Sequence, residues 1–397
     1  MRIAMFSDNF YPELSGIADS IRTTAEELAS RGHEIHFLVP SYSAADYQRV
    51  HLRQHQARWR RGITVTRLAA VRYRTGTAQG RFVIPTLLRW LHLLGKKPDV
   101  IHFHLPLSTG VEAVVAARLL QVPLIGTNHT PIKEFIRYAP IRAKWFLRLA
   151  VRYDAWMYNQ CVFVSSPSQT LLREMRKAGL RRPAQRISNP IQSAIFHPLP
   201  RKAALKKKYR AEGFTLLYIG RLAPEKHIEV LLRAVAQLSG SIPSLRLLVG
   251  GTGSEEAALR RLAQQLGIAQ RTVFLGYISS LERMNEIYNA ADVFVMPSTA
   301  ETQSIVTMQA MACALPVIAA RAWGLQEYVT KERGILVPPK NPRALAEAIF
   351  SLFQNPRKRR MLGQEGKKFA ATLSPAAIAA KWEQLYAHAQ QTATRRA

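Results

Sequence analysis

Residues 293–320 read VFVMPSTAETQSIVTMQAMACALPVIAA and contain, in order, a strand, a turn, the start of a helix and a second strand. The two strand candidates, VFVMPS (293–298) and PVIAA (316–320), are continuous apolar runs. Strands of this kind, separated by helices, are typical of a parallel sheet that is covered by helices on both faces. The stretch therefore predicts an open α/β sheet. Residues 296–316 start at the end of its first strand candidate, 293–298.

The same alternation runs along the whole chain. In its first half we expect strands at residues 2–7, 34–40, 64–69, 100–104, 123–129 and 161–167, and a helix from about Ser20 to Arg31. In its second half we expect strands at 215–221, 244–251 and 272–277 besides the two above, and a helix at 228–238. Residues 196–213 contain two prolines and a basic run, which suits a linker. We therefore predict an N-terminal domain at 1–195, a linker at 196–213, a C-terminal domain at 214–375, and a last helix at 376–397 that packs back on the N-terminal domain.

Length and composition restrict the function. A chain of 397 residues suits two domains of about 200 residues each. The 56 Lys and Arg against 26 Asp and Glu give a net charge of +30, which favours anionic partners such as phosphates, nucleic acid or an anionic membrane face. The two cysteines, Cys161 and Cys313, exclude a disulfide scaffold and suit a reducing cytoplasm. The apolar amino-terminal stretch, which Asp8 interrupts, is too short for a signal peptide, and no run of about 18 apolar residues predicts a spanning helix.

Two loops that follow strands carry candidate binding residues. The first, GRLAPEK (220–226), places Arg221 and Lys226 at the carboxyl end of a strand, where two cations would favour an anionic group such as a phosphate. Taken alone, the same two residues also fit a solvated loop. The second loop places Glu301 before residues 302–306, whose backbone amides open a helix, and a helix amino terminus is an anion site.

Together these loops resemble those of the retaining family 4 glycosyltransferases, which have the GT-B fold. That family carries G-R-x-x-x-x-K after the first strand of its second domain, and a Glu-x₇-Glu motif after a strand that ends in Pro-Ser. The resemblance implies an α/β protein of two Rossmann-like domains whose parallel sheets face a central cleft. It also implies that Arg221 and Lys226 hold the donor diphosphate and that Glu301 contacts the donor sugar.

The second acid of the family motif is replaced by Gln309 in this chain. The resemblance places this position at the ribose of the donor. An amide hydrogen-bonds a diol through its carbonyl oxygen, but it lacks the charge that strengthens such bonds. We expect the donor site to include, besides Gln309 and the two cations, the residues at the start of the helix: Thr302, Gln303, Ser304 and Ile305.

The N-terminal half carries two further matches. PELSG (12–16) resembles the family loop Pro-x-x-G-G, with Ser15 at the first glycine, and Gly16 would let the backbone approach the diphosphate. His129 follows a strand and resembles the family histidine beside the donor sugar, where it supports the reaction centre; a hydrogen-bonded interior histidine is the alternative. We expect His102 and His104 to point to opposite faces of their strand and therefore not to share a metal ion. Because the chain has no Asp-x-Asp, we expect neither a divalent cation nor a cofactor.

Residues 131–158 suggest the acceptor, because this segment mixes six Lys and Arg residues with aromatic ones. A basic, aromatic, partly helical surface suits an anionic bilayer, although a domain helix with a solvated basic face has the same pattern. Glu-Thr-Gln at 301–303 also resembles transferases that glycosylate diacylglycerol. We therefore predict a metal-independent retaining enzyme that moves a hexose from a nucleotide donor, UDP-glucose, onto diacylglycerol. It would lie at the inner face of the cell membrane, and no nucleic-acid partner is expected.

Two alternatives stay open. The acceptor could instead be a cell-envelope glycan precursor or a soluble sugar. The replacement by Gln309 and the high positive charge would also fit a protein without catalysis that binds nucleotide sugars or nucleic acid.

Overall fold

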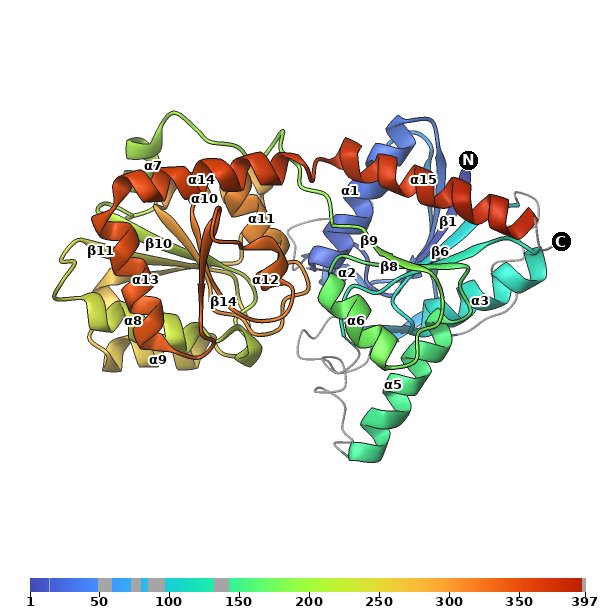
Figure 1. Cartoon of the computed structure of the whole chain (residues 1–397), viewed down its shortest axis with the longest axis horizontal. Coiled ribbons are helices and arrows are strands. Elements are labelled where there is room, and N and C mark those ends of the chain that lie inside the picture. Colours follow the sequence, from blue (N-terminus) through green and yellow to red (C-terminus); the bar gives the residue numbers. More distant parts are fainter. Residues whose placement is uncertain (14, 49–58, 73–79, 85–96, 132–142, 395–397) are drawn as a thin grey trace. The chain divides into compact units, whose positions relative to one another are not determined.

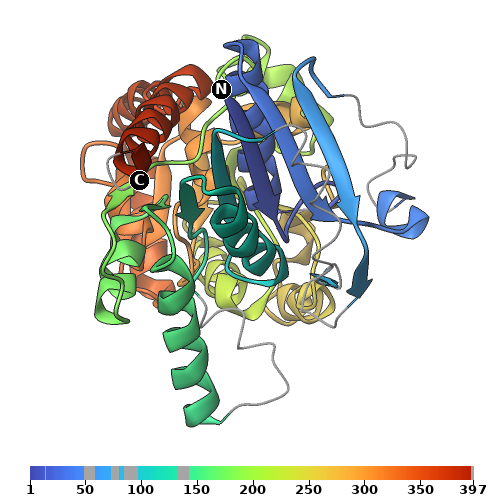
Figure 2. The same cartoon turned by 90° about the vertical axis from the view of Figure 1, so that its right-hand side faces the viewer.

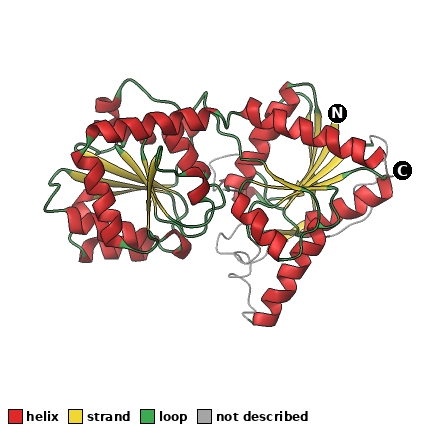
Figure 3. Cartoon of the chain, viewed as in Figure 1, coloured by secondary structure: helices red, strands yellow, loops and turns green. Residues whose placement is uncertain are grey.

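A computed structural model describes the chain except for residues 14, 49–58, 73–79, 85–96, 132–142 and 395–397. The described residues form two α/β units. The N-terminal unit contains residues 1–190 and 375–397, and the C-terminal unit contains residues 191–374. In each unit, helices lie on both sides of a parallel sheet (Figure 3), so the predicted fold class is confirmed.

The sheet of the N-terminal unit has the strand order β3-β2-β1-β6-β7-β8-β9, and all its neighbouring pairs are parallel. Its strands are β1 (Arg2–Ser7), β2 (Glu34–Pro40), β3 (Ile63–Leu68), β6 (Val100–His104), β7 (Leu124–Thr127), β8 (Phe163–Ser166) and β9 (Ala184–Arg186). A separate hairpin pairs β4 (Ala70–Arg72) with β5 (Arg81–Val83). The strand order reverses between β1 and β6, and ligands of open α/β sheets bind beyond the carboxyl ends of the strands at such a point.

Helices α1 (Gly16–Ser30), α2 (Ala44–Gln48), α3 (Ser108–Leu120), α5 (Lys144–Tyr158) and α6 (Gln169–Lys177) belong to this unit. The residue that replaces the family glycine has a clear local role, because the side chain of Ser15 accepts a hydrogen bond from the backbone nitrogen of Ala18 at 3.1 Å. Ser15 is thus the amino-terminal cap of α1 and satisfies one of the free amides there. Gly16 is the first residue of the helix.

The last helix, α15 (Pro375–Thr394), belongs to the N-terminal unit, where it packs against α1 and β6. Its Tyr386 lies 2.9 Å from Nδ1 of His102, and Trp382 packs on the same imidazole. At the surface, Glu383 accepts hydrogen bonds from the guanidinium of Arg31, which is the main reason why the pKa of this carboxyl falls to about 2.

The sheet of the C-terminal unit has the order β12-β11-β10-β13-β14-β15, and all its neighbouring pairs are again parallel. Its strands are β10 (Phe214–Ile219), β11 (Leu245–Gly250), β12 (Thr272–Gly276), β13 (Val293–Met296), β14 (Val317–Ala320) and β15 (Gly334–Val337). Its helices are α7 (Lys202–Lys208), α8 (Ile228–Leu238), α9 (Glu256–Gln265), α10 (Leu281–Ala290), α11 (Ile305–Ala312), α12 (Leu325–Tyr328), α13 (Pro342–Gln354) and α14 (Pro356–Ala371). The order reverses between β10 and β13, which are the two strands that precede the predicted donor loops. Within the described part of the chain, no helix is long and apolar enough to cross a membrane.

Candidate active site

The loop after β10 is held against the loop after β11 by close backbone contact. A Cβ atom at Gly251 would lie 1.9 Å from the carbonyl oxygen of Gly220, and one at Gly253 would lie 2.2 Å from that of Leu222. Both distances exclude a side chain, and the φ of +118° at Gly251 favours glycine as well. The glycine-rich stretch 250–253 therefore sets the position of the loop that carries Arg221 and Lys226.

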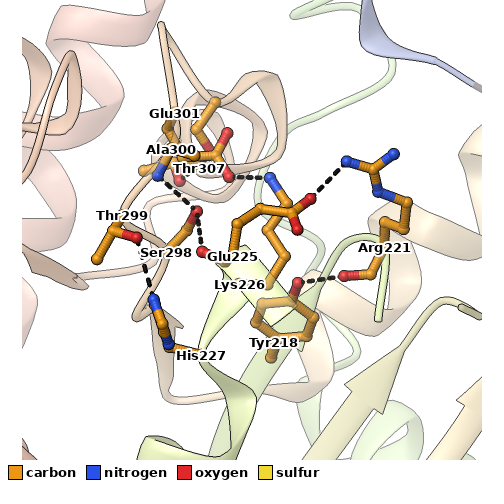
Figure 4. A network of polar contacts seen from close by, with 11 residues as sticks. Tyr218, Arg221, Glu225, Lys226, His227, Ser298, Thr299, Ala300, Glu301 and Thr307 are labelled. Carbon is orange, nitrogen blue, oxygen red and sulfur yellow. Dashed lines mark hydrogen bonds and ion pairs between the residues drawn. The ribbon is translucent and has the colours of Figure 1, made fainter. Parts of the chain in front are cut away.

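Arg221 is paired within its own loop. Its guanidinium donates to Glu225 at 2.6 Å, and its backbone oxygen accepts from the hydroxyl of Tyr218 at 2.9 Å (Figure 4). Burial alone would raise the pKa of Glu225, but its backbone hydrogen bond and the charges of Arg221 and Lys226 keep that pKa below its usual value. Glu225 was not among the predicted site residues. It orients the arginine and leaves part of the guanidinium exposed to a ligand.

Lys226 and Glu301 form an ion pair that joins the two predicted loops of this unit (Figure 4). The residues are 75 positions apart, and both side chains are largely buried. A backbone hydrogen bond also joins the two loops, because the backbone nitrogen of Thr299 donates to the carbonyl oxygen of Glu225 at 3.1 Å. The structure thus places a cation suited to a diphosphate beside a carboxylate suited to sugar hydroxyls.

The helix that follows Glu301 starts at Ile305, so Thr302 and Gln303, which we expected at its start, lie before it. Ser304, with a φ of +63°, precedes α11, and its hydroxyl lies 2.7 Å from that of Thr307. Gln303 is fully buried, and Thr302 is half-buried. A Cβ atom at Gly324 would lie 1.6 Å from the carbonyl oxygen of Thr302, so only glycine fits opposite this turn.

Gln309, in α11, is half-buried and oriented by a core tyrosine. The hydroxyl of Tyr288 lies 3.1 Å from the side-chain oxygen of Gln309 and 3.0 Å from the backbone oxygen of Val306. Among the described residues, the amide nitrogen of Gln309 has no partner. The nitrogen is therefore the part of this side chain that is free to donate a hydrogen bond to a ligand.

In the N-terminal unit, His129 belongs to a buried cluster of three histidines. His104 Nδ1 lies 3.0 Å from His129 Nε2, while His102 Nε2 lies 2.7 Å from the hydroxyl of Thr127. Burial lowers the pKa of both His102 and His129 to about 3, so these rings are neutral near pH 7. The cluster lines a small cavity of about 10 Å³, which is room for roughly one water molecule.

The expectation that His102 and His104 point to opposite faces is wrong. Their ring centroids lie 4.1 Å apart. Residues two apart on a strand share a face, because successive side chains alternate. Even so, no set of three or more His, Cys, Asp or Glu side chains within the described ranges is arranged to hold a metal ion.

Two buried carboxyls near the ends of these strands were not predicted. Asp8 follows β1 and accepts hydrogen bonds from Ser108 and from the backbone of Thr109, and burial raises its pKa to about 6. Asp154 lies on α5, where Asn128 donates to one oxygen at 3.4 Å and burial raises the pKa to about 7. Among the residues that the structure describes, the other Asp154 oxygen has no hydrogen-bond partner. The sequence contains a signal for Asp8 alone, because it interrupts the apolar run of the first strand. Asp154 had no such signal.

Asp154→Asn is expected to stabilise the protein more at pH 8 than at pH 5. Above its folded pKa of about 7 the wild-type carboxylate is charged and buried at a cost, whereas below its usual pKa of 3.8 it is protonated in both states. At pH 5 the folded-state carboxyl is protonated while the unfolded one is already ionised, so about two pKa units of the cost appear between pH 5 and pH 8. At about 1.4 kcal/mol per unit, the gain at pH 8 should exceed that at pH 5 by about 3 kcal/mol. Urea unfolding of both proteins at the two pH values measures this, and an equal gain at both would contradict it.

Comparison with known proteins identifies the class. Each unit is a parallel α/β sheet with predicted binding loops at its strand ends, and the family described as "Glycosyltransferase Family 4" matches residues 14–194. The family described as "Glycosyl transferases group 1" matches residues 201–369. A Bacillus subtilis protein named as a glycosyltransferase, EpsD, is 30% identical over 300 residues, which is 72% of this chain and 76% of that protein. The chain belongs to the family 4, group 1 glycosyltransferases. It is therefore an enzyme, and the hypothesis of a protein without catalysis is not supported.

Further relatives differ in donor and acceptor. A GDP-mannose-dependent alpha-mannosyltransferase of Mycobacterium tuberculosis is 28% identical over 85% of this chain and 84% of that protein. An alpha-monoglucosyldiacylglycerol synthase of Acholeplasma laidlawii is 24% identical over 94% of this chain and 93% of that protein.

Solved structures support the GT-B fold. A sucrose-phosphate synthase from Thermosynechococcus elongatus aligns with a TM-score of 0.78 at 23% identity, over 98% of each chain. HepE from Anabaena, solved with UDP, gives the same TM-score at 20% identity, over 98% of this chain and all of that one.

Proposed function

We propose that this glycosyltransferase moves glucose from UDP-glucose onto diacylglycerol at an anionic membrane surface. The donor part of the proposal is supported by the chemistry of the C-terminal unit. Arg221 and Lys226 supply two cations for the diphosphate, Glu301 supplies a carboxylate for sugar hydroxyls, and the start of α11 supplies backbone amides. The N-terminal unit adds two groups that suit the same donor. His129 supplies a neutral imidazole that can hydrogen-bond the sugar, and the start of α1 at Gly16 supplies backbone amides for the diphosphate.

The observation that carries the acceptor part is the outer face of α5. Trp145, Leu149 and Trp156 are 62%, 57% and 53% exposed, far more than such side chains usually are in a soluble domain. They lie at helical spacing on one face, with exposed Arg148 and Arg152 beside them. Figures 1 and 2 both show α5 reaching outward from the sheet of its unit. Residues 132–142 of the predicted basic segment lie outside the described residues.

An exposed aromatic and basic helix face fits an anionic bilayer. Indole rings are favoured at the level of the lipid headgroups, and each Arg near such a surface contributes about 1 kcal/mol of attraction. The named activity of the Acholeplasma laidlawii relative, which makes a glucosyl lipid, supports the same acceptor class. Mannosyl transfer is the second candidate, because a GDP-mannose-dependent enzyme also matches most of the chain.

A panel of radiolabelled donors tests the proposal. UDP-glucose, UDP-galactose and GDP-mannose are each incubated with purified protein and vesicles that contain diacylglycerol, with and without a chelator. We expect a labelled lipid from UDP-glucose alone, with an unchanged rate in the chelator. Transfer from GDP-mannose only would show that the donor is GDP-mannose and not UDP-glucose. Label found only in added soluble sugars or glycan precursors would show that the acceptor is not diacylglycerol.

A further inference from the structure

A second pocket lies in the N-terminal unit, at the carboxyl end of α5. It has a volume of about 530 Å³ and is lined mainly by Arg152, Trp156, Asn159, Gly179, Arg181 and Arg182. We call it the arginine pocket. Its wall is made by the last turns of α5 on one side and by the turn that follows α6, residues 178–182, on the other. Its described lining residues include none from the predicted donor loops.

One residue fixes the shape of the arginine pocket. The Asn159 side-chain nitrogen donates to the carbonyl oxygen of Gly179 at 2.9 Å, and its side-chain oxygen accepts from the backbone nitrogen of Arg181 at 2.8 Å. Its carbonyl oxygen accepts from Nε of Arg182 at 2.7 Å. Three hydrogen bonds of a single residue thus hold the turn against α5. They fix the backbone positions from which the arginine side chains extend.

The charge of the arginine pocket is not balanced from within. No carboxylate is among the described residues that line it. Within the described part of the chain, the side chains of Arg152 and Arg181 form no hydrogen bond or ion pair. Basic side chains often serve the free carbonyls at a helix carboxyl terminus, and Arg182 does this at Asn159. The other two arginines have no such role, so their charge is free for an anion.

The arginine pocket also continues the exposed face of α5. Trp156 lines the pocket and is 53% exposed, and it belongs to the same helix face as Trp145 and Leu149. A planar guanidinium donates two parallel hydrogen bonds to phosphate oxygens, and an indole ring suits the level of the headgroups. We propose that the arginine pocket seats the phosphate of an anionic membrane lipid while the α5 face lies on the bilayer. This inference rests on the membrane surface in the proposed function.

The test is vesicle binding by charge-matched variants. Arg152→Gln/Arg181→Gln removes two charges from the arginine pocket. Arg60→Gln/Arg61→Gln removes two exposed charges from the same unit, in the turn before β3. On phosphatidylglycerol vesicles we expect the first pair to weaken binding roughly 25-fold, since about 1 kcal/mol per Arg is about fivefold each. The control pair should weaken it only a few-fold. An equal loss of vesicle binding in both variants would mean that the net positive charge alone attracts the vesicles, and it would overturn the proposed lipid site.

Two further measurements separate the sources of phosphate and the two proposals. The emission of Trp156, taken as the difference between wild type and Trp156→Phe, should shift to shorter wavelength on phosphatidylglycerol vesicles and not on phosphatidylcholine vesicles. The same shift with inorganic phosphate alone would overturn the lipid assignment. Glucose transfer by wild type to a short-chain diacylglycerol without vesicles is measured separately. If transfer fails while vesicle binding keeps its dependence on the arginine pocket, the proposed function is wrong and the pocket stands.

Discussion

Glu301→Gln is expected to lower kcat by roughly 100- to 1,000-fold, because it removes a charge aimed at the donor sugar. Glutamine keeps the shape of the side chain and one oxygen. It loses the ion pair with Lys226 and the charge-assisted bonds that a carboxylate makes to hydroxyl groups. The loss of one oriented electrostatic partner costs about 3 kcal/mol in other enzymes, which corresponds to this range. Steady-state transfer at saturating donor measures the effect.

The matched control for this variant is Glu332→Gln. Glu332 also lies in the C-terminal unit, and its side chain is 59% exposed, so the same change of charge there should leave kcat within about twofold. Circular dichroism and the thermal midpoint of both variants should match wild type. A Glu301→Gln enzyme with full kcat would show that this carboxylate is not part of the catalytic site.

The fold was predictable because its signals are local. Continuous apolar runs often mark buried parallel strands. β1 and β2 match their predicted ranges, and β10 lies within two residues of its predicted range. Four strands were missed: the hairpin strands β4 and β5 and the edge strands β9 and β15. β9 is a three-residue strand at the edge of its sheet that reads AQR and is mostly exposed. β15 is a four-residue strand at the other sheet's edge.

The residues of the candidate site were predictable from motifs, whereas their partners were not. Arg221, Lys226 and Glu301 stand at strand ends in recognisable loops. That Lys226 pairs with Glu301 depends on the approach of two loops 75 residues apart. The packing of His104 on His129, and the bond of Tyr288 to Gln309, likewise depend on which strands and helices become neighbours. Such contacts have no signal in the local sequence, because they are fixed only when the sheet is assembled.

The pairing of Lys226 with Glu301 leads to the second large effect. Lys226→Gln is expected to lower kcat/KM for the donor by roughly 100-fold or more, for two reasons. It removes a cation suited to the diphosphate, and it leaves Glu301, whose side chain is only 12% exposed, as a charge without its partner. Steady-state kinetics with varied donor concentration measures the loss, and Lys331→Gln, at a 92% exposed lysine of the same unit, serves as the control.

A double-mutant cycle then separates the two reasons. Once Glu301 is glutamine, the change at Lys226 no longer strands a buried charge, so it should cost several-fold less than it does in the wild type. Only the missing attraction to the diphosphate would remain. If the two losses simply multiply, the ion pair is incidental and each residue acts on the donor alone. If Lys226→Gln keeps wild-type kcat/KM, the diphosphate does not bind at this loop, and the assignment of Arg221 fails with it.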